Sequence, residues 1–322
     1  MARTIAPIDR ELPPITRSTG SVIVLLAGVF FSFGGLAFRS VEIRSWEYLF
    51  YRGLGMGAVA AVVLGVRYRG RIERLIILPT HIVAGFILGA MNILFIVSLE
   101  FASVAFVLVL QPLSPLAAAY FSWLVMKERP AIAVLVATAL SIVGVVVMVW
   151  GSIADDVSPY GFLALLIPIG FGLYATIVRS TQRIDPMVPL FVGALVLMTI
   201  GTLVVLFTGG FEASAGDAAT GLFAGSVLLA VPLAAFNVAQ RVVPASETAL
   251  LLMSEVVLAP IWVWLFMGES ASASTLVGGA IILVAVLGVM ANRIRRRNLS
   301  GSGEDGARQA RGILTRSFTS RG

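Results

Sequence analysis

Apolar residues are grouped along this chain into ten long runs that are separated by short polar segments. Each run has 19 to 26 residues, which lets a helix rising about 1.5 Å per residue cross a hydrocarbon layer of about 30 Å. The predicted membrane spans are 20–38, 46–66, 79–98, 101–126, 130–151, 159–178, 186–208, 218–239, 244–267 and 271–292. The pattern therefore predicts an all-α integral membrane protein with ten transmembrane helices.

The basic residues are distributed very unequally between the two sets of connecting segments. When the chain is threaded through the ten spans, 20 of its 23 Lys and Arg residues fall on one side. The other side receives only Arg39 and Arg44, and Arg52 lies inside a span. Because positively charged loops stay in the cytoplasm, we expect both termini to be cytoplasmic, in a bacterial-type plasma (inner) membrane.

Composition agrees with a membrane protein and narrows its chemistry. Hydrophobic residues make up 58% of the chain and charged residues 12%, about half the usual charged fraction. The pI near 10.3 comes from basic residues beside the bilayer, so we predict contact with anionic lipid and no nucleic-acid partner. The chain has no cysteine, which excludes disulfides and thiolate chemistry.

The two halves of the chain repeat each other at an offset of about 141 residues. "FSWLVMKE" at 121–128 aligns with "WVWLFMGE" at 262–269, and Arg39-Ser40 and Arg179-Ser180 each follow the first span of a half. Since each half has five spans, an odd number, the halves enter the membrane from opposite faces. Inverted repeats of this kind are typical of secondary transporters, whose substrate site lies near the midplane between the halves.

This repeat divides the chain into four predicted parts. Residues 20–151 form the first five-helix half and residues 159–292 the second. Residues 1–19 form a cytoplasmic N-terminal segment, and residues 293–322 form a basic cytoplasmic tail, both expected to be largely disordered. These flanking segments are too short for a soluble catalytic domain, so we expect the protein to function within the membrane.

The sequence resembles the drug/metabolite transporter superfamily, specifically its EamA-type members with ten helices. The resemblance covers roughly residues 20–292 and rests on three segments: "PLSPLAAAYFSWLVMKERP" at 112–130, "SEVVLAPIWVWLFMGES" at 254–270, and Arg52 in "LFYRGLGMG". The first two segments are similar to the family's fourth and ninth helices. Relatives often follow the ninth-helix Glu with Pro, whereas this chain has Glu255-Val256, so we expect the kink at Pro260 instead. The resemblance implies a permease of small metabolites, often an exporter.

Four charged residues lie inside the spans, and Glu255 is the most informative of them. Glu255 is the twelfth residue of its 24-residue span, too deep for its short side chain to reach an interface. It is therefore expected to be protonated, paired or facing water, either as a substrate contact or proton-coupling group in a cavity or as a buried structural hydrogen-bonding group. Arg52 lies about 9 Å from a span end by helix rise, and it either snorkels out or holds an anionic group in the cavity. Glu47 and Glu247 lie in the first turns of their spans and are expected to reach the interface.

Polar residues in other spans are further candidates for the cavity. Gln111 and Ser114 begin a stripe of polar and small residues along one face of the fourth span. Such a stripe serves helix packing as often as substrate binding, but Ser114 is the repeat mate of Glu255, which favours the cavity. Asn92, Tyr174 and Asn237, in the third, sixth and eighth spans, are the remaining candidates.

Several competing functions lack the residues they require. The single lysine, Lys127, is not part of a phosphate-binding loop, and the single histidine, His81, cannot form a zinc site alone, so no ATPase, metal site or cofactor is predicted. We therefore predict a secondary transporter rather than an enzyme, moving a small organic solute by alternating access. An exporter of amino acids or related metabolites is favoured; an importer or facilitator of a vitamin-like solute, and a channel, remain alternatives. Substrate, direction, proton coupling and oligomeric state are left open.

Overall fold

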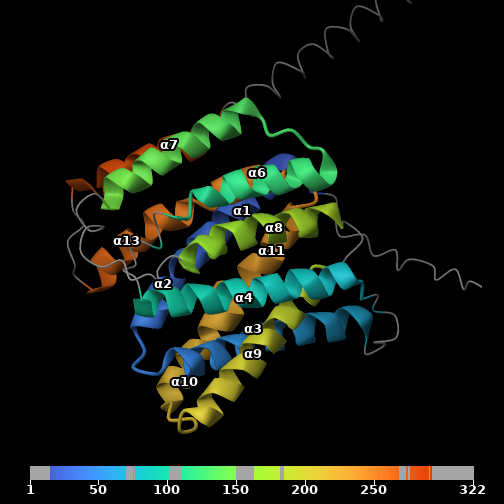
Figure 1. Cartoon of the computed structure of the whole chain (residues 1–322), viewed down its shortest axis with the longest axis vertical. Helices are drawn as coiled ribbons and strands as arrows, with labels where there is room; N and C mark the ends of the chain where they lie inside the picture. Colours follow the sequence, from blue (N-terminus) through green and yellow to red (C-terminus); the bar gives the residue numbers. More distant parts are fainter. Residues whose placement is uncertain are drawn as a thin grey trace, which may run out of the picture.

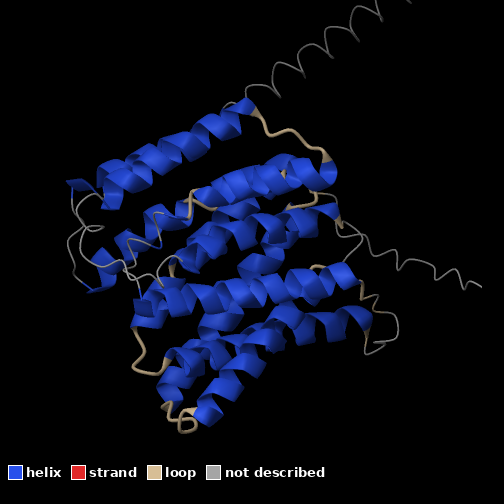
Figure 2. Ribbon diagram, in the orientation of Figure 1, coloured by secondary structure: helices blue, strands red, loops and turns tan. Residues whose placement is uncertain are grey.

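The computed structural model of the chain is entirely helical in the part that it describes. It describes residues 15–69, 75, 77–101, 107, 110–149, 163–181, 185–267, 273–274, 276–289 and 291. Within these residues Figure 2 shows helices joined by loops and no strand. The helices lie side by side, with α3, α9 and α10 at one edge of the molecule and α7 at the other (Figure 1). The predicted N-terminal segment, except for its last five residues, and the predicted tail lie outside the described residues.

The helices follow the predicted spans closely. In the first half they are α1 (Arg17–Ser32), α2 (Gly34–Arg39), α3 (Ser45–Tyr68), α4 (Pro79–Phe101), α6 (Leu113–Met126) and α7 (Ile132–Val149). In the second half they are α8 (Leu166–Ser180), α9 (Met187–Phe207), α10 (Ala215–Phe223), the π-helix η3 (Ala224–Ala230), α11 (Val231–Ala239), α12 (Ala245–Leu251), α13 (Ser254–Met267) and the apolar helix Leu276–Val289.

The described helices account for all ten predicted spans. Six helical segments are long and apolar enough to cross a membrane, and α6, α7 and Leu276–Val289 are shorter apolar helices. The remaining span, the ninth, consists of α12 and α13 together. The prediction of an all-helical membrane protein is therefore confirmed.

The fourth and ninth spans are broken rather than continuous, and the break in the fourth span falls at a mid-span proline, Pro112. α6 begins after a turn at Gln111–Pro112, and α13 begins after a turn at Leu252–Met253. The bonds from the N–H groups of Met253, Glu255 and Val256 reach back three residues, so these groups stay satisfied although the helix stops. α13 continues through Pro260, and the break in the ninth span falls instead at the repeat mate of Pro112, so the kink expected at Pro260 stays a prediction.

Helices α3 and α9, which are repeat mates, are joined at both of their ends. At one end Arg67 Nη1 donates to Asp185 Oδ2 over 2.8 Å; at the other end Arg44 Nη1 donates to the Thr208 carbonyl over 2.6 Å. Arg44 and Asp185 lie 141 residues apart, as do Arg67 and Thr208, so the two contacts occupy equivalent places in the repeat. The start of each helix thus meets the end of the other, as an inverted repeat requires.

Glycine residues allow α9 to pack closely between α3 and α4. A Cβ atom on Gly53 would come within 2.8 Å of Leu197, and one on Gly89 would come within 2.7 Å of Val196. Both glycines therefore serve close helix packing, because any side chain would push the helices apart. α9 belongs to the second half and its two neighbours to the first, so this packing fastens the halves together.

The ion pairs sort the loop segments into two ends of the helix bundle. The end that carries Arg17, Arg67 and Arg179 is called here the basic end, and the end that carries Arg44 and Thr208 is called the opposite end. Each pair joins residues that the sequence threading places on the same side, which agrees with alternating spans.

Glu47 and Glu247 do not simply reach the interface, as the sequence suggested, but are buried and paired. Glu47 is 1% exposed, accepts from Arg44, and also accepts from the backbone N–H groups of Glu212 and Ala213. Glu247 is 4% exposed and binds Arg17 at 2.6 Å. Both lie near span ends; Arg44 is three residues from Glu47, whereas the other contacts come from segments distant in sequence.

Candidate functional site

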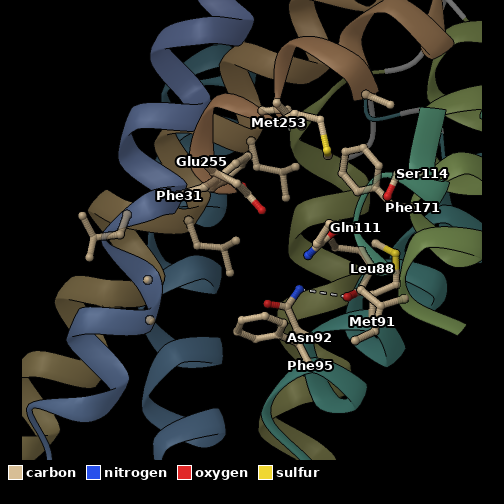
Figure 3. Close-up of a pocket in the computed structure, with 18 of the residues that line it drawn as sticks. Phe31, Leu88, Met91, Asn92, Phe95, Gln111, Ser114, Phe171, Met253 and Glu255 are labelled. Carbon is tan, nitrogen blue, oxygen red and sulfur yellow. Dashed lines mark hydrogen bonds between the residues drawn. The ribbon is translucent and has the colours of Figure 1, made fainter. Parts of the chain in front are cut away.

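A cavity of about 150 Å³ lies between the two halves of the protein. Helices of both halves contribute to its wall, and five of the seven predicted site residues line it: Arg52, Asn92, Gln111, Ser114 and Glu255. Figure 3 shows Glu255 on one side of this cavity and Gln111, Asn92 and Ser114 across from it. The break between α12 and α13 and the start of α6 both lie at the cavity wall.

The cavity extends from the middle of the bundle toward the opposite end. Gly34 and Gly35 line it from α2, and Phe95 lines it from the part of α4 that is farther from the basic end. A Cβ atom built on either glycine would meet no atom of the described residues within 4 Å, so within this part of the chain the two glycines leave room in the wall.

Glu255 is presented to the cavity by the break in the ninth span. It is the second residue of α13, and its carboxylate points into the space from the helix start (Figure 3). Among the described residues its side chain makes no hydrogen bond and no ion pair. A carboxylate in this position is available to a solute or a proton.

Arg52 is the cationic group of the cavity. It lies on α3, is 8% exposed, and its Nε and Nη1 atoms have no hydrogen-bond partner among the described residues. It lies within electrostatic range of Glu255 without forming an ion pair with it in the part of the chain described. A buried guanidinium with open donors is a binding group for an anion, because leaving it unpaired is costly.

Ser114, Gln111 and Asn92 add neutral polar groups. Ser114 lies in the first turn of α6, is 2% exposed, and its hydroxyl has no partner among the described residues. Asn92 donates from Nδ2 to the Leu88 carbonyl over 2.9 Å. The side-chain oxygen of Asn92 takes no part in this bond. These groups could orient a bound solute by hydrogen bonds.

Tyr174 and Asn237 lie outside the wall of this cavity. The Tyr174 hydroxyl donates to Asn237 Oδ1 over 2.9 Å, and Asn237 Nδ2 donates to the Pro186 carbonyl over 3.2 Å. Both side chains are buried, and Asn237 also borders a much smaller cavity of about 10 Å³ near the basic end. These contacts connect α8, α11 and the start of α9, so the two residues act in helix packing in this structure.

Comparison with known proteins identifies the family of the chain. A model of the EamA-like transporter family matches residues 18–150 and again residues 159–291. The chain belongs to the EamA-like transporter family. It is therefore a multi-pass membrane transporter made of two homologous halves, and it is not an enzyme.

Solved structures support the fold of this EamA-like transporter, but no curated protein matches its sequence significantly. One similar structure, titled only "Crystal structure of protein", has a TM-score of 0.72 and 17% sequence identity. The match covers 84% of this chain and 96% of the other. At this identity the likeness shows the fold alone.

The apolar wall of the EamA-like transporter's cavity was missed by sequence analysis. Phe31, Phe95 and Phe171 line the cavity together with Met91 and Met253. In a chain with 19 Phe and 10 Met, such residues cannot be told from those that face lipid. The repeat offers a signal only for Met253, which occupies the place of Pro112.

Proposed function

We propose that this transporter carries a small organic metabolite by alternating access and binds it in the cavity between the halves. The observation that carries the proposal is the pair of opposite charges, Glu255 and Arg52, at a cavity wall formed by two broken spans. Broken helices at equivalent places of inverted repeats commonly form the substrate sites of secondary transporters. Among the described residues the cavity extends toward the opposite end and is separated from the basic end by packed helices, which supports a carrier rather than an open channel.

The charges favour a solute that carries both an anionic and a cationic group. Arg52 and the positive start of α6, where Ser114 lies, would attract a carboxylate, and Glu255 would attract an ammonium group. Phenylalanine and methionine residues would surround the apolar part of the solute. An amino acid or a related metabolite fits this arrangement, and the family resemblance favours export over uptake.

Glu255 is the proposed coupling group. A carboxylate that faces the cavity and has no fixed partner can take up a proton from one side and release it to the other side as access alternates. Proton binding and substrate binding would then compete for the same side chain. This arrangement would let a proton gradient drive transport of the solute.

Flux measurements on purified protein in proteoliposomes test the proposal. Uptake and efflux of a panel of amino acids and related metabolites should be measured with and without a pH gradient. We expect saturable flux of at least one solute that responds to the gradient. Flux that rises in proportion to concentration without saturating would instead indicate a channel.

The orientation proposed for the membrane places the basic end and both termini in the cytoplasm. Single cysteines can be introduced without background, because the natural chain has none. In intact cells, an impermeant thiol reagent should label a cysteine at position 214 and should not label one at position 71 or 302. The reverse pattern would invert the proposed orientation.

A further inference from the structure

Equivalent faces of the sixth and first spans have different surroundings. Thr176 of α8 is fully buried and lies 3.3 Å from the Ser122 hydroxyl of α6. Its repeat mate, Gly35 of α2, lines the cavity, and a Cβ atom on it would meet no atom of the described residues within 4 Å. Among the described residues, the path is therefore closed between α6 and α8 near the basic end, whereas Gly35 borders the cavity near the opposite end.

The closed contact between α6 and α8 also depends on a glycine. A Cβ atom on Gly172 would come within 2.5 Å of the Ala118 backbone nitrogen, so α8 can approach α6 only because this side chain is absent. One turn farther along α8 toward the basic end is the Ser122–Thr176 contact, and beyond it lies Arg179. These successive contacts along α8 separate the cavity from the basic end.

Arg179 makes the outermost of these contacts and binds two other segments of the chain at once. Its Nε and Nη2 atoms donate to the two carboxylate oxygens of Glu128 over 3.0 and 2.8 Å. Its Nη1 atom donates to the carbonyls of Gln240 and Val243, each over 2.9 Å. Glu128 follows α6 in the first half, whereas the two carbonyls lie between α11 and α12 in the second half. One side chain thus fastens the halves across the closed path.

The packing of α3 against α9, called here the α3–α9 joint, differs from the contact between α6 and α8, although it also carries an ion pair at the basic end. The Arg67–Asp185 contact has its repeat equivalent, Arg44–Thr208, formed at the opposite end of the same structure. A contact that is formed at both ends at once does not depend on which end is open. At Gly35, the repeat mate of Thr176, the described residues form no equivalent of the Ser122–Thr176 contact, so the α6–α8 packing is the part expected to change with the state of the protein.

We propose that Arg179 and Glu128 form the gate that closes the cavity to the basic end, and that the α3–α9 joint stays fixed while this gate opens. This inference rests on the alternating access proposed above. Opening requires Arg179 to release Glu128 and both carbonyls, after which water can replace these bonds. Weakening the gate should therefore shift the population of states toward the one open at the basic end.

The test uses two cysteine reporters on the cysteine-free chain. Ser122→Cys lies in the closed path, and Gly35→Cys lies in the open part of the cavity, where its side chain has room. Each reporter is combined with Glu128→Gln, which keeps the shape of the side chain and removes its charge. Labelling rates are measured with an impermeant thiol reagent in membrane vesicles of both orientations.

The expected result is a reciprocal change. Glu128→Gln should raise the labelling rate of Ser122→Cys from the basic end by roughly fivefold, because the pair it weakens is only partly exposed. The same variant should lower the labelling of Gly35→Cys from the opposite end. The matched control is Asp185→Asn, which removes a carboxylate from the fixed joint at the same end and should leave both rates unchanged.

Other outcomes would overturn the inference in distinguishable ways. If both reporters become more reactive, or neither changes, Glu128 does not control access. If Asp185→Asn produces the same reciprocal change, the α3–α9 joint is not fixed. If Ser122→Cys stays protected in every variant while transport of a solute continues, the alternating-access proposal fails together with the gate.

Discussion

The helices α6 and α13 share one backbone design but differ in their chemistry. Each has 14 residues, and both their first and their last residues lie 141 positions apart in the sequence. At their second positions, however, α6 has Ser114 and α13 has Glu255. Arg52 likewise has an uncharged mate, Gly193. The repeat thus preserves the break in the helix, while each half supplies a single charge of its own to the cavity.

This difference shows that the helix breaks and the charged side chains of the site are under separate constraints. A broken helix is needed in both halves, because it opens the backbone toward the middle of the membrane. A carboxylate is present in only one of them, where it is available for a proton or a cationic group. The fold is therefore symmetric and the proposed binding chemistry is not.

The largest expected effect comes from removing the charge that distinguishes α13 from α6. Glu255→Gln is nearly isosteric but never ionises, so we expect it to be expressed and folded while the response of transport to a pH gradient is lost completely. Flux in proteoliposomes with equal and unequal pH on the two sides measures this.

A matched variant separates this effect from a general loss of a buried carboxylate. Glu247→Gln removes a carboxylate that is paired with Arg17 outside the cavity. It should lower thermal stability, because Arg17 loses its partner, and it should keep the response to the pH gradient. A normal pH response in Glu255→Gln would reduce Glu255 to a structural group and refute proton coupling through it.

A smaller effect is expected at the equivalent position of α6. Ser114→Ala removes a buried hydroxyl that has no partner among the described residues, so the thermal stability should stay the same or rise slightly. If this hydroxyl binds the solute, the apparent affinity for it should fall by roughly tenfold, as expected for one lost hydrogen bond. Thermal unfolding in detergent and the concentration dependence of flux measure the two quantities.

Tyr174→Phe is the control for Ser114→Ala, because it also removes one buried hydroxyl. Here the hydroxyl is paired with Asn237, so its loss should destabilise the protein by about 1 kcal/mol. The apparent affinity for the solute should not change, since Tyr174 does not line the cavity. If the affinity for the solute changes in Tyr174→Phe and not in Ser114→Ala, the assignment of Ser114 to solute binding and of Tyr174 to helix packing is wrong.

The spans could be predicted from sequence because length and apolarity are sufficient to define a helix that crosses a membrane. The break in the fourth span falls at Pro112, and a proline is itself a local signal for an interrupted helix. The break in the ninth span could not be predicted in this way, since Leu252 and Met253 carry no local signal for a turn. The prediction for the ninth span relied on Pro260, whereas the position of the break follows the repeat. Only the alignment of Met253 with Pro112 could have indicated it.

The candidate site could be predicted only in part, for a related reason. Charged residues such as Arg52 and Glu255 are conspicuous in apolar spans, because their burial requires a compensating environment. Tyr174 and Asn237 also looked like cavity residues, but they satisfy each other across α8 and α11. Pairing of this kind depends on which helices are neighbours, and the order of residues in the chain does not reveal it.

The glycine-lined contact of α9 with α3 and α4 has a consequence for the origin of the protein. Gly53 and Gly89 of the first half receive residues of a helix from the second half, so either half alone would leave part of this contact unfilled. An ancestral chain of five spans would have needed a second copy of itself, inserted upside down, to cover the same surface. Such an ancestor would have needed to enter the membrane in both orientations, and joining two copies in one chain would then fix one orientation for each copy.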